Sequence, residues 1–596
     1  MTDTAKSDAP ADVTEPISNV RHADRVRMIL LVGIALLTWL PRLRGPIDFR
    51  WDGCVYYVLG TSLATGHGYR LLSEPGNIAA IQYPPLLPAI IALHQRVMGT
   101  TDFIAVGHAL RISFMFLFMG YVGAVYRLTR HFLSPNFAFA ATAFCLFNVQ
   151  ICFMSDACYP EILYGFATVL FVLCSRSTVR WKRSVGAAGF VIAAYALRTV
   201  GIVALAAWVL ESLIAKRWRC SAMRIVIALL PVLLWQRYIH RVETSAAYMQ
   251  PAYTYQRADY MFYNISYARS VRLKDQFMPE MGYLNARDVA QRLLGNAMGM
   301  PESLGQAVSA DNNRWTALWK GIRERLRIRS TVTWPVHVIP ILFGIVVFAG
   351  IKILVTKREW LIATYVVLSL LALCATPWLQ QFGRYLTPLC AFLDLALFLA
   401  LQAILKPPGY VASGRLQRVR RALAVGTLTT LALVHAFLFG YTYWKQHPQV
   451  QYRNLGGRQI AYPLFYYTDA HRAFDQGLDR LMLRAKPGEV AACSMPSWAY
   501  LRTGLKSVMP PLEVDPAKAT ALLDSVPVHY LFIDDGLAVD TRRYMIPVVT
   551  HSPERWRLIY SASIVQDGKR LKDRFQIYER IPPISASVSP SGTNSR

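Results

Sequence analysis

Long apolar runs alternate with short polar segments along most of this chain, and the pattern predicts a protein built mainly of membrane-spanning helices. A helix needs about 20 apolar residues to cross the hydrocarbon core of a bilayer, with about 17 as the lower bound. The runs at 184–199 and 200–215 form either two short spans or one long tilted helix. The expected fold is an all-α polytopic membrane bundle of about eleven spans, at 26–43, 104–126, 135–154, 158–175, 184–199, 200–215, 223–239, 334–354, 359–376, 386–405 and 422–442.

Basic residues occupy alternate connections between these runs, and they set the expected orientation. Lys and Arg are enriched in the cytoplasmic loops of membrane proteins. The first run is followed by Pro41 and Arg42 and not by a small-residue cleavage site, which predicts an uncleaved span. We therefore expect a multi-pass protein of the cytoplasmic (inner) membrane, with its N-terminus in the cytoplasm and its C-terminus outside. The basic connections begin at Arg127, Arg176, Lys216, Lys352 and Lys406.

Three longer segments then fall on the outer face, and long loops are uncommon unless they are functional. Two are loops, in which we expect interfacial helices, and the third is the chain from residue 444 onward. That third segment has helical spacing at 470–486 and 516–525 and β-prone runs at 490–493, 528–533, 556–564 and 574–578, which predict a small α/β domain. The expected organisation is a disordered cytoplasmic tail at 1–25, a transmembrane domain at 26–443 with outer loops 44–103 and 241–333, an extracytoplasmic α/β domain at 444–580 and a disordered tail at 581–596.

The composition agrees with a membrane protein and excludes two other classes. Of the 596 residues, 54% are hydrophobic and 17% are charged, whereas soluble domains average about 25% charged residues. This hydrophobicity excludes a disordered chain. The net charge of +28 does not indicate nucleic-acid binding, because the basic residues sit in short clusters between apolar runs. The nine cysteines have no CxxC or metal-ligand spacing, which favours apolar packing.

The first outer loop contains the most informative residues. Asp52 follows the end of the first span, and Tyr56, Leu59 and Leu63 follow it at helical spacing. This spacing predicts an amphipathic helix that lies in the membrane interface, with Asp52 near its start. A carboxylate at that position is either an ordinary helix N-cap or a catalytic group, and the sequence leaves both readings open.

Several motifs in this chain together resemble the GT-C superfamily of membrane glycosyltransferases. The resemblance is to the branch with protein O-mannosyltransferases, lipid A aminoarabinose transferases and bacterial lipopolysaccharide-core transferases, and it covers about residues 25–440. At one place the chain departs from the O-mannosyltransferases, which usually carry an Asp-Glu pair where Gly53 follows Asp52. The matching elements are Asp52 with the helix after it, Tyr83–Leu86, Ser155–Asp156 with Glu161–Tyr164, Arg198–Gly201 and Arg384–Pro388.

The resemblance implies an inverting hexosyl- or pentosyltransferase that works at the outer face of the membrane. The sugar would come from a polyprenyl-phosphate donor, and the departure at Gly53 favours a glycolipid or polysaccharide acceptor over a protein. Such transfer needs a carboxylate base and cationic or metal help for the phosphate leaving group. The implied roles are catalytic acids for Asp52 and Asp156, donor phosphate binding for Arg384 and Arg70, and acceptor or sugar binding for Tyr56, Tyr83, Glu161 and Arg198, with a Glu161–Arg198 ion pair as the structural alternative.

Some enzymes of this kind also bind a divalent metal, and Glu74 with His240 is the pair that the resemblance offers for it. Two other functions are open on the sequence. A transporter or flippase would show inverted repeats and charges near the bilayer midplane, and neither is visible here. A polysaccharide polymerase or ligase typically has its chemistry in one large late loop, whereas the motif-bearing acid of this chain is in the first loop.

Overall fold

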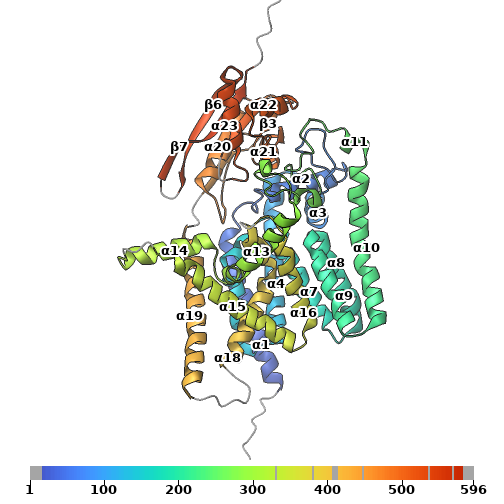
Figure 1. The fold of residues 1–596 in the computed structure, drawn as a ribbon, viewed down its shortest axis with the longest axis vertical. Coiled ribbons are helices and arrows are strands. Elements are labelled where there is room, and N and C mark those ends of the chain that lie inside the picture. Colours follow the sequence, from blue (N-terminus) through green and yellow to red (C-terminus); the bar gives the residue numbers. More distant parts are fainter. Residues whose placement is uncertain are drawn as a thin grey trace, which may run out of the picture.

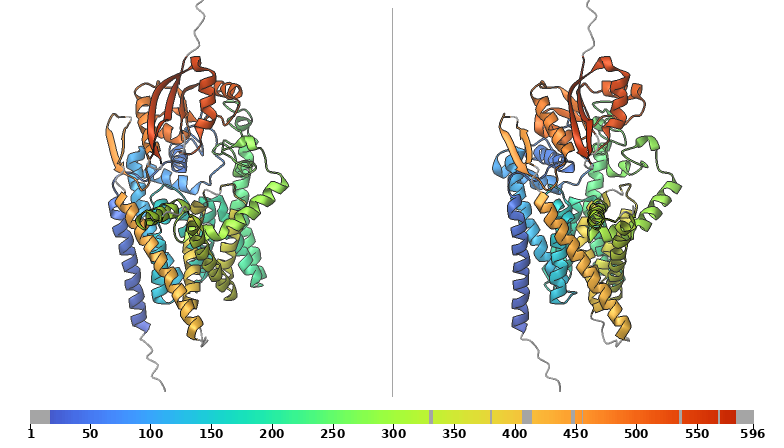
Figure 2. Two further views of the ribbon diagram at one scale, coloured as in Figure 1. Left: turned by 60° about the vertical axis from the view of Figure 1, so that its left-hand side comes forward. Right: turned by 90° about the vertical axis from the view of Figure 1, so that its left-hand side faces the viewer.

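The computed structural model describes residues 17–328, 332–378, 381–405, 414–445, 449–454, 456–534, 537–566 and 569–581. A bundle of helices carries a layer of loops and short helices at one end, and a small α/β part covers that layer (Figures 1 and 2). The chain is thus mostly helical with a C-terminal β region. All seven strands of the described chain lie after residue 448.

The helices of the bundle follow the predicted apolar runs closely. Each of the eleven runs falls on a helix or a bent pair of helices. The bundle helices are α1 (Ile17–Trp39), α4 (Phe103–Arg130), α5 (Pro135–Phe147), α6 (Val149–Ser155), α7 (Glu161–Ser175), α8 (Ala187–Leu197), α9 (Ile202–Ile214), α10 (Trp218–Glu243), α15 (Trp334–Thr356), α16 (Trp360–Cys374), α17 (Phe382–Leu386), α18 (Cys390–Leu405) and α19 (Gly414–Lys445).

The expected count of eleven spans is not confirmed. In the described chain, five helical segments are long and apolar enough to cross a membrane. The pair α5 and α6, bent by 60°, would make a sixth. Helices α7, α9 and α16 are apolar but shorter. The protein is therefore a multi-pass membrane protein with five to six long candidate spans, and the remaining spans stay a prediction.

The ambiguous stretch at 184–215 is two helices. Helix α8 ends at Leu197, a 3₁₀ turn covers Thr199–Gly201, and α9 begins at Ile202. A Cβ on Gly201 would lie 2.5 Å from the Tyr195 Cα, so only glycine allows the chain to turn back this tightly. The alternative of one long tilted helix is wrong.

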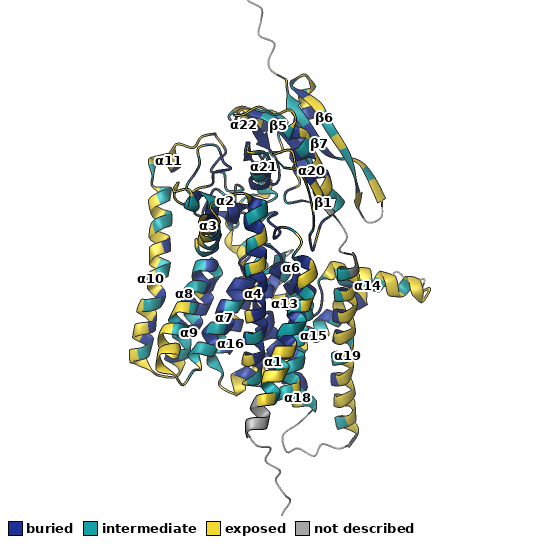
Figure 3. Ribbon diagram, turned by 180° about the vertical axis from the view of Figure 1, so that it is seen from behind, coloured by how far each residue is buried: buried dark blue, intermediate teal, exposed yellow. Residues whose placement is uncertain are grey.

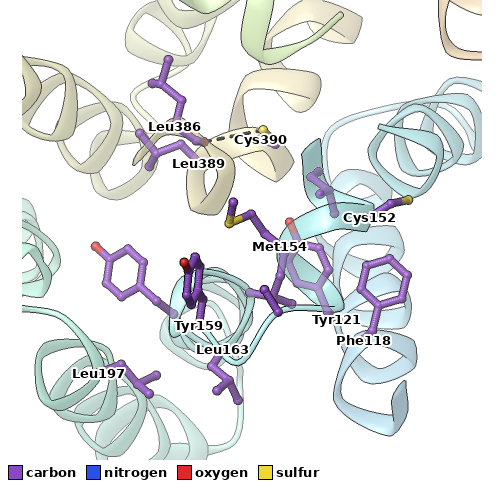
Figure 4. Packing of buried hydrophobic residues seen from close by; sticks show 14 of the residues in the cluster. Phe118, Tyr121, Cys152, Met154, Tyr159, Leu163, Leu197, Leu386, Leu389 and Cys390 are labelled. Atoms are coloured by element: carbon purple, nitrogen blue, oxygen red, sulfur yellow. Dashed lines mark hydrogen bonds between the residues drawn. The ribbon is translucent and has the colours of Figure 1, made fainter. Parts of the chain in front are cut away.

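Packing in the bundle centres on α18. Every described side chain of this helix from Cys390 to Leu401 is buried, because α5, α15 and α19 pack around it. The dark core in Figure 3 continues from this helix into α4 and α7. Near the top of the bundle, residues of α4, α6 and α7 pack against the 386–390 segment, with Met154 and Tyr159 between them (Figure 4).

The outer layer is built from the two predicted loops, which contain helices as expected. The first loop holds α2 (Asp52–Ala64) and α3 (Leu86–Met98). The second holds the short turns α11 (Ala246–Met249) and α12 (Tyr267–Ser270), followed by α13 (Ala286–Ala307) and α14 (Asn312–Arg325).

Helix α2 differs from the prediction in its surroundings. It is a helix from Asp52 onward, but its residues from Gly53 to Gly60 are all buried. It packs on α3 and on α21 (Pro496–Thr503), which comes from the C-terminal part of the chain. The prediction of an amphipathic helix lying on the membrane surface is therefore wrong, since protein covers both of its faces.

The C-terminal part has a five-stranded sheet in the order β4-β3-β5-β7-β6. Strands β3, β4 and β5 are parallel to one another, while β7 is antiparallel to both β5 and β6. Each helix and strand predicted for this part is present. The elements are β1 (Gln449–Arg453), β2 (Gln459–Pro463), α20 (Asp469–Met482), β3 (Val490–Ala492), α21, β4 (Lys506–Val508), α22 (Pro516–Asp524), β5 (Val528–Ile533), α23 (Thr541–His551), β6 (Trp556–Gln566) and β7 (Lys569–Arg580).

The predicted tails fall mainly outside the described residues. Residues 1–16 and 582–596 are not described. Helix α1 already begins at Ile17, so the expected disordered tail at 1–25 is too long. The C-terminal part rests on the outer layer through the segment 72–77, because the Ser507 amide donates to the Ser73 carbonyl over 2.9 Å.

Candidate active site

A cavity of about 880 Å³ lies between the bundle, the outer loops and the C-terminal part. Residues from all three regions line it. Ligand sites are usually concave, mostly apolar and provided with a few convergent polar groups. Among the residues placed by sequence, Asp52, Tyr56, Tyr83, Arg198 and Arg384 line this cavity.

Four charged side chains meet at the cavity and form one network, which we call the charge cluster (Asp52, Glu161, Arg198 and Arg384). The Arg384 Nη2 lies 2.7 Å from the Asp52 Oδ2. The Arg384 Nε donates to the Glu161 Oε1, and the Arg198 Nη1 donates to the same oxygen over 2.7 Å. Two carboxylates and two guanidinium groups balance, so the cluster has no net charge.

Glu161 anchors this network from within the helix bundle. It is the first residue of α7 and is fully buried. Its Oε1 accepts from both arginines, while its Oε2 has no hydrogen-bond partner among the described residues. A buried carboxylate is costly unless it is paired. The two arginines therefore stabilise Glu161, and Glu161 in turn holds both guanidinium groups at the cavity wall.

Asp52 is positioned by an unusual backbone. It is the first residue of α2, and Trp51 before it has a φ of 56°, a conformation that a bulky residue seldom adopts. The Trp51 Nε1 donates to the Leu537 carbonyl over 2.9 Å, which ties this turn to the C-terminal part. Strained residues persist only where their surroundings fix them, and they gather at functional sites.

The surroundings keep Asp52 ionised. Burial raises the pKa of this carboxyl, but the charge of Arg384, with hydrogen bonds from Arg384, Tyr263 and Tyr83, outweighs burial and holds the pKa below its usual value. The Tyr263 hydroxyl donates to the Asp52 Oδ1 over 3.0 Å. Asp52 is thus a carboxylate at neutral pH, already bound to a cation and to a hydroxyl.

Aromatic rings surround the charge cluster. Tyr56 and Tyr83 lie 4.7 Å apart between ring centroids, and Arg384 lies over the Tyr159 ring at 4.4 Å. A second aromatic group, at the C-terminal part, contains Trp51 and Tyr466, whose centroids are 6.2 Å apart. The cavity therefore has a charged wall and an aromatic wall, joined at the neighbouring residues Trp51 and Asp52.

Two predicted site residues are not at the cavity. Asp156 is buried, and Arg111 binds both of its oxygens, with Nε at 2.8 Å and Nη2 at 2.6 Å. Arg70 is exposed, and its guanidinium donates to the Asn77 carbonyl. The structure assigns Asp156 to a closed ion pair and brings neither residue to the cavity wall.

The residues predicted for a metal do not assemble a site. Among the described residues, no group of three His, Cys, Asp or Glu side chains is placed to hold a metal ion. Glu74 is buried and accepts from the Tyr253 hydroxyl over 2.9 Å, whereas His240 is exposed near the end of α10. Burial raises the pKa of Glu74 to about 7, against hydrogen bonds from Tyr253, Asn264 and Gln256 that lower it. The residues present do not fit a metal held by Glu74 and His240.

Several residues that line the cavity are not among the site residues predicted from the sequence. Tyr263 and Tyr267 belong to a tyrosine-rich stretch, which is typical of a membrane interface but also suits stacking on sugars. Trp51 stands beside Asp52 in the sequence, and nothing else in the sequence indicates that it belongs to the site. The aromatic residues 465–467 and the loop at Leu537 come from the C-terminal part, so only the fold brings them to the cavity.

Comparison with known proteins gives structural likenesses only. No family model matches the chain, and no curated protein matches it. The structure is similar to the archaeal oligosaccharyltransferase AglB of Archaeoglobus fulgidus, solved with an inhibitory peptide and a dolichol-phosphate, at 12% identity and a TM-score of 0.48, over 92% of this chain and 74% of that one.

Two further likenesses are of the same kind. ArnT of Cupriavidus metallidurans bound to undecaprenyl phosphate is 12% identical with a TM-score of 0.45, over 92% of this chain and 97% of that one. The arabinofuranosyltransferase AftD from Mycobacteria is 12% identical with a TM-score of 0.39, over 93% of this chain and 40% of that one. The lipid A aminoarabinose transferase named in the sequence resemblance is thus among the similar structures. At this identity, none of the likenesses assigns a role to a residue of this chain.

Proposed function

We propose that this protein is a membrane glycosyltransferase that moves a sugar from a polyprenyl-phosphate donor to a glycolipid or polysaccharide acceptor at the outer face of the cytoplasmic membrane. The observation that carries the proposal is the charge cluster at a large aromatic-lined cavity on top of an apolar bundle. An isolated carboxylate or a lone arginine would not support it. The cluster supplies both a base and cations within one cavity.

Two arginines are available to bind the donor phosphate. Arg384 and Arg198 both line the cavity and are both held by Glu161. Guanidinium groups bind phosphate through paired charge-assisted hydrogen bonds. When the sugar–phosphate bond breaks, negative charge grows on the leaving phosphate, and fixed cations stabilise that charge. The polyprenyl chain would lie along the apolar helices that form the floor of the cavity.

Asp52 is the proposed base. An acceptor hydroxyl would give its proton to the Asp52 carboxylate while its oxygen bonds to the anomeric carbon. The bond from that carbon to the phosphate oxygen breaks, and its electron pair leaves with the polyprenyl phosphate. Because Arg384 pairs with Asp52, a donor phosphate that draws Arg384 away would strengthen Asp52 as a base. Positioned bases of this kind contribute about 10²–10⁴-fold to rate.

The acceptor would enter from the aromatic wall. Trp51 and Tyr466 are partly exposed beside the proposed base. Broad aromatic faces with polar edges suit the ring faces of saccharides, because they contact carbon and hydroxyl groups together. This placement favours a saccharide-bearing acceptor over a transported solute, since it sets the acceptor hydroxyl next to Asp52.

The test is a comparison of cell-envelope glycolipids and polysaccharides by mass spectrometry. It uses cells with the intact gene, cells without it and cells with Asp52→Asn at normal protein level. We expect one sugar to be lost from the same product in the deletion strain and in the variant. Loss of the sugar in the deletion strain with full transfer by Asp52→Asn would refute the role of Asp52. No change in any glycan would refute the proposed reaction.

A further inference from the structure

Helix α14 projects sideways from the molecule, and Trp315 is the one buried residue of its fourteen (Figures 1 and 3). It runs across the ends of α15 and α19 that lie nearest the C-terminal part (Figure 1). Its first half packs against the body, where Trp315 is buried and lies 6.4 Å from the Phe343 ring of α15. Its second half extends beyond the bundle.

The apolar residues of α14 form one stripe. Leu318 and Trp319 lie three and four residues after Trp315, Ile322 lies four and three residues after them, and Leu326, which caps the helix, follows four residues later, so these side chains share one face of the helix. The stripe is covered at its start and uncovered at its end, where Ile322 is 38% exposed and Leu326 is 67% exposed. The start of the stripe packs on the spanning helix α15. The uncovered end lies on the same face of α14 and therefore points toward the layer of the spanning helices.

The other faces of α14 are strongly basic. Residues 312–328 contain five basic side chains and one acidic side chain, a net charge of 5 − 1 = +4. Lys320, Arg325 and Arg327 are exposed, and none of them forms an ion pair with another described residue. On the predicted outer face these charges oppose the positive-inside rule, which disfavours Lys and Arg there. The excess of basic residues on α14 therefore suggests an anionic partner outside the protein.

We propose that the outer half of α14 is a lipid-binding device, in which Ile322 and Leu326 enter the acyl chains while Lys320, Arg325 and Arg327 bind anionic phospholipid headgroups of the outer leaflet. An amphipathic helix with a basic polar face binds in this way, through apolar burial together with electrostatic attraction. Trp319 and Trp334 flank the device, and tryptophan is enriched at membrane interfaces.

The first turn of α14, at the opposite end from the lipid-binding half, forms part of the cavity wall. Asn313 and Arg314 in the first turn of α14 line the cavity, and the Asp311 side chain caps the same turn through the Arg314 amide at 2.9 Å. A helix held by lipid along its outer half keeps this wall in place. The lipid-binding role stands on the helix itself and does not depend on the proposed transfer reaction.

Hydrogen exchange of the full protein in lipid nanodiscs tests the inference. One set of nanodiscs holds phosphatidylcholine alone and a second holds phosphatidylcholine with phosphatidylglycerol. We expect exchange in residues 316–328 to be roughly tenfold slower with the anionic lipid, and 0.5 M salt to abolish the difference, since a Debye length of roughly 4 Å at that salt screens the headgroup attraction. Equal exchange in the two lipids would overturn the proposal.

A matched pair of variants distinguishes lipid binding by α14 from a general effect of the protein's positive charge. Lys320→Gln with Arg325→Gln and Arg327→Gln should remove the effect of anionic lipid. The same loss of three charges on the exposed β6–β7 hairpin, Lys569→Gln with Arg570→Gln and Lys572→Gln, should leave the effect intact. An effect that survives the first set, or disappears with the second, would contradict the assignment to α14. An unchanged melting temperature is the folding control for both.

Discussion

Two of the acid–arginine pairs in the outer half of this molecule, Asp156–Arg111 and Asp52–Arg384, differ in how completely each is satisfied. Arg111 binds both oxygens of Asp156, both side chains are 1% exposed, and Arg111 also donates to the Arg44 and Gly45 carbonyls. Arg384 is divided between Asp52 and Glu161, and at 16% and 14% exposure Arg384 and Asp52 open into the cavity. The first pair is complete without a ligand, whereas the second has groups that a ligand can engage.

The comparison explains why the same residue types have different roles. A buried ion pair with every hydrogen bond made holds two segments together, and its loss is felt as instability. A shared arginine at a cavity wall gains from a phosphate that supplies further acceptors. The distinction rests on the partners of each group and not on the distance between the charges, which is similar in the two pairs.

The largest expected effect comes from Asp52→Asn. Transfer should fall by about 10³-fold, because the amide cannot accept the acceptor proton. Thermal stability should change little, since Arg384 keeps Glu161 as a counter-charge and can still donate to the amide oxygen, while the Tyr263 hydroxyl can accept from the amide nitrogen. Transfer assays and melting curves on the same preparation check both parts. A variant that keeps wild-type transfer would remove Asp52 from the mechanism.

Asp156→Asn should have the opposite effect, a loss of stability with little change in the transfer activity of the folded protein. It leaves the buried Arg111 without its counter-charge, and breaking such a pair costs about 3–5 kcal/mol. The melting temperature should fall clearly, while the protein that remains folded still transfers sugar. Asp24→Asn is the control, because Asp24 pairs with Arg130 at a partly exposed position and such pairs contribute at most about 1 kcal/mol. Equal stability of the two variants would contradict a structural role for Asp156.

Sequence patterns predicted the helices of the bundle well and also the Glu161–Arg198 ion pair, but not the partners of Asp52 and Asp156. Apolar runs are local, so each expected span falls on a helix. Asp52 and Asp156 gave the same local signal, an acid near the outer end of an apolar run. Arg111 and Arg384, which decide their roles, come from other helices. The helix at Asp52 was predicted, but its burial was not, because α21 covers it from the far end of the chain.

Glu74 is a third buried acid, and it sharpens the comparison because it accepts a hydrogen bond from the Tyr253 hydroxyl, whereas Asp52 and Asp156 pair with arginines. Its pKa is raised from 4.5 to about 7, first by burial. The folded protein therefore holds this proton more tightly than the unfolded chain, and the stability it gives is complete below pH 4.5 and is lost as pH rises through about 7.

Glu74→Gln should remove this part of the pH dependence. The shift corresponds to a stability change on the order of 3 kcal/mol at most. Above pH 7 the variant should melt higher relative to wild type than it does near pH 4.5. Melting curves from pH 4 to pH 9 on both proteins measure the difference, in which other titrating groups cancel. A constant difference across this range would show that Glu74 does not titrate as proposed.

Arg384→Gln tests the open pair from its cationic side. We expect binding of undecaprenyl phosphate to weaken by about 10²-fold, because a positioned charged donor to the phosphate is lost. Arg70→Gln is the matched control, since Arg70 is exposed and bonded to a nearby carbonyl away from the cavity wall. Calorimetric titration with undecaprenyl phosphate compares the two. A loss of affinity in the Arg70 variant alone would assign phosphate binding to Arg70 and not to Arg384.

The smallest expected effect concerns Trp51, which joins the open pair to the C-terminal part. Trp51→Phe keeps an aromatic ring beside Asp52 but removes the hydrogen bond to the Leu537 carbonyl. A single hydrogen bond contributes about 0.5–1.5 kcal/mol, so transfer should fall only severalfold, with the KM for the acceptor rising and undecaprenyl phosphate affinity unchanged. Trp181→Phe at an exposed position on the helix bundle is the control. If Trp51→Phe weakened donor binding instead, the turn at Trp51 would serve the phosphate side of the cavity, and the division into a charged and an aromatic wall would be wrong.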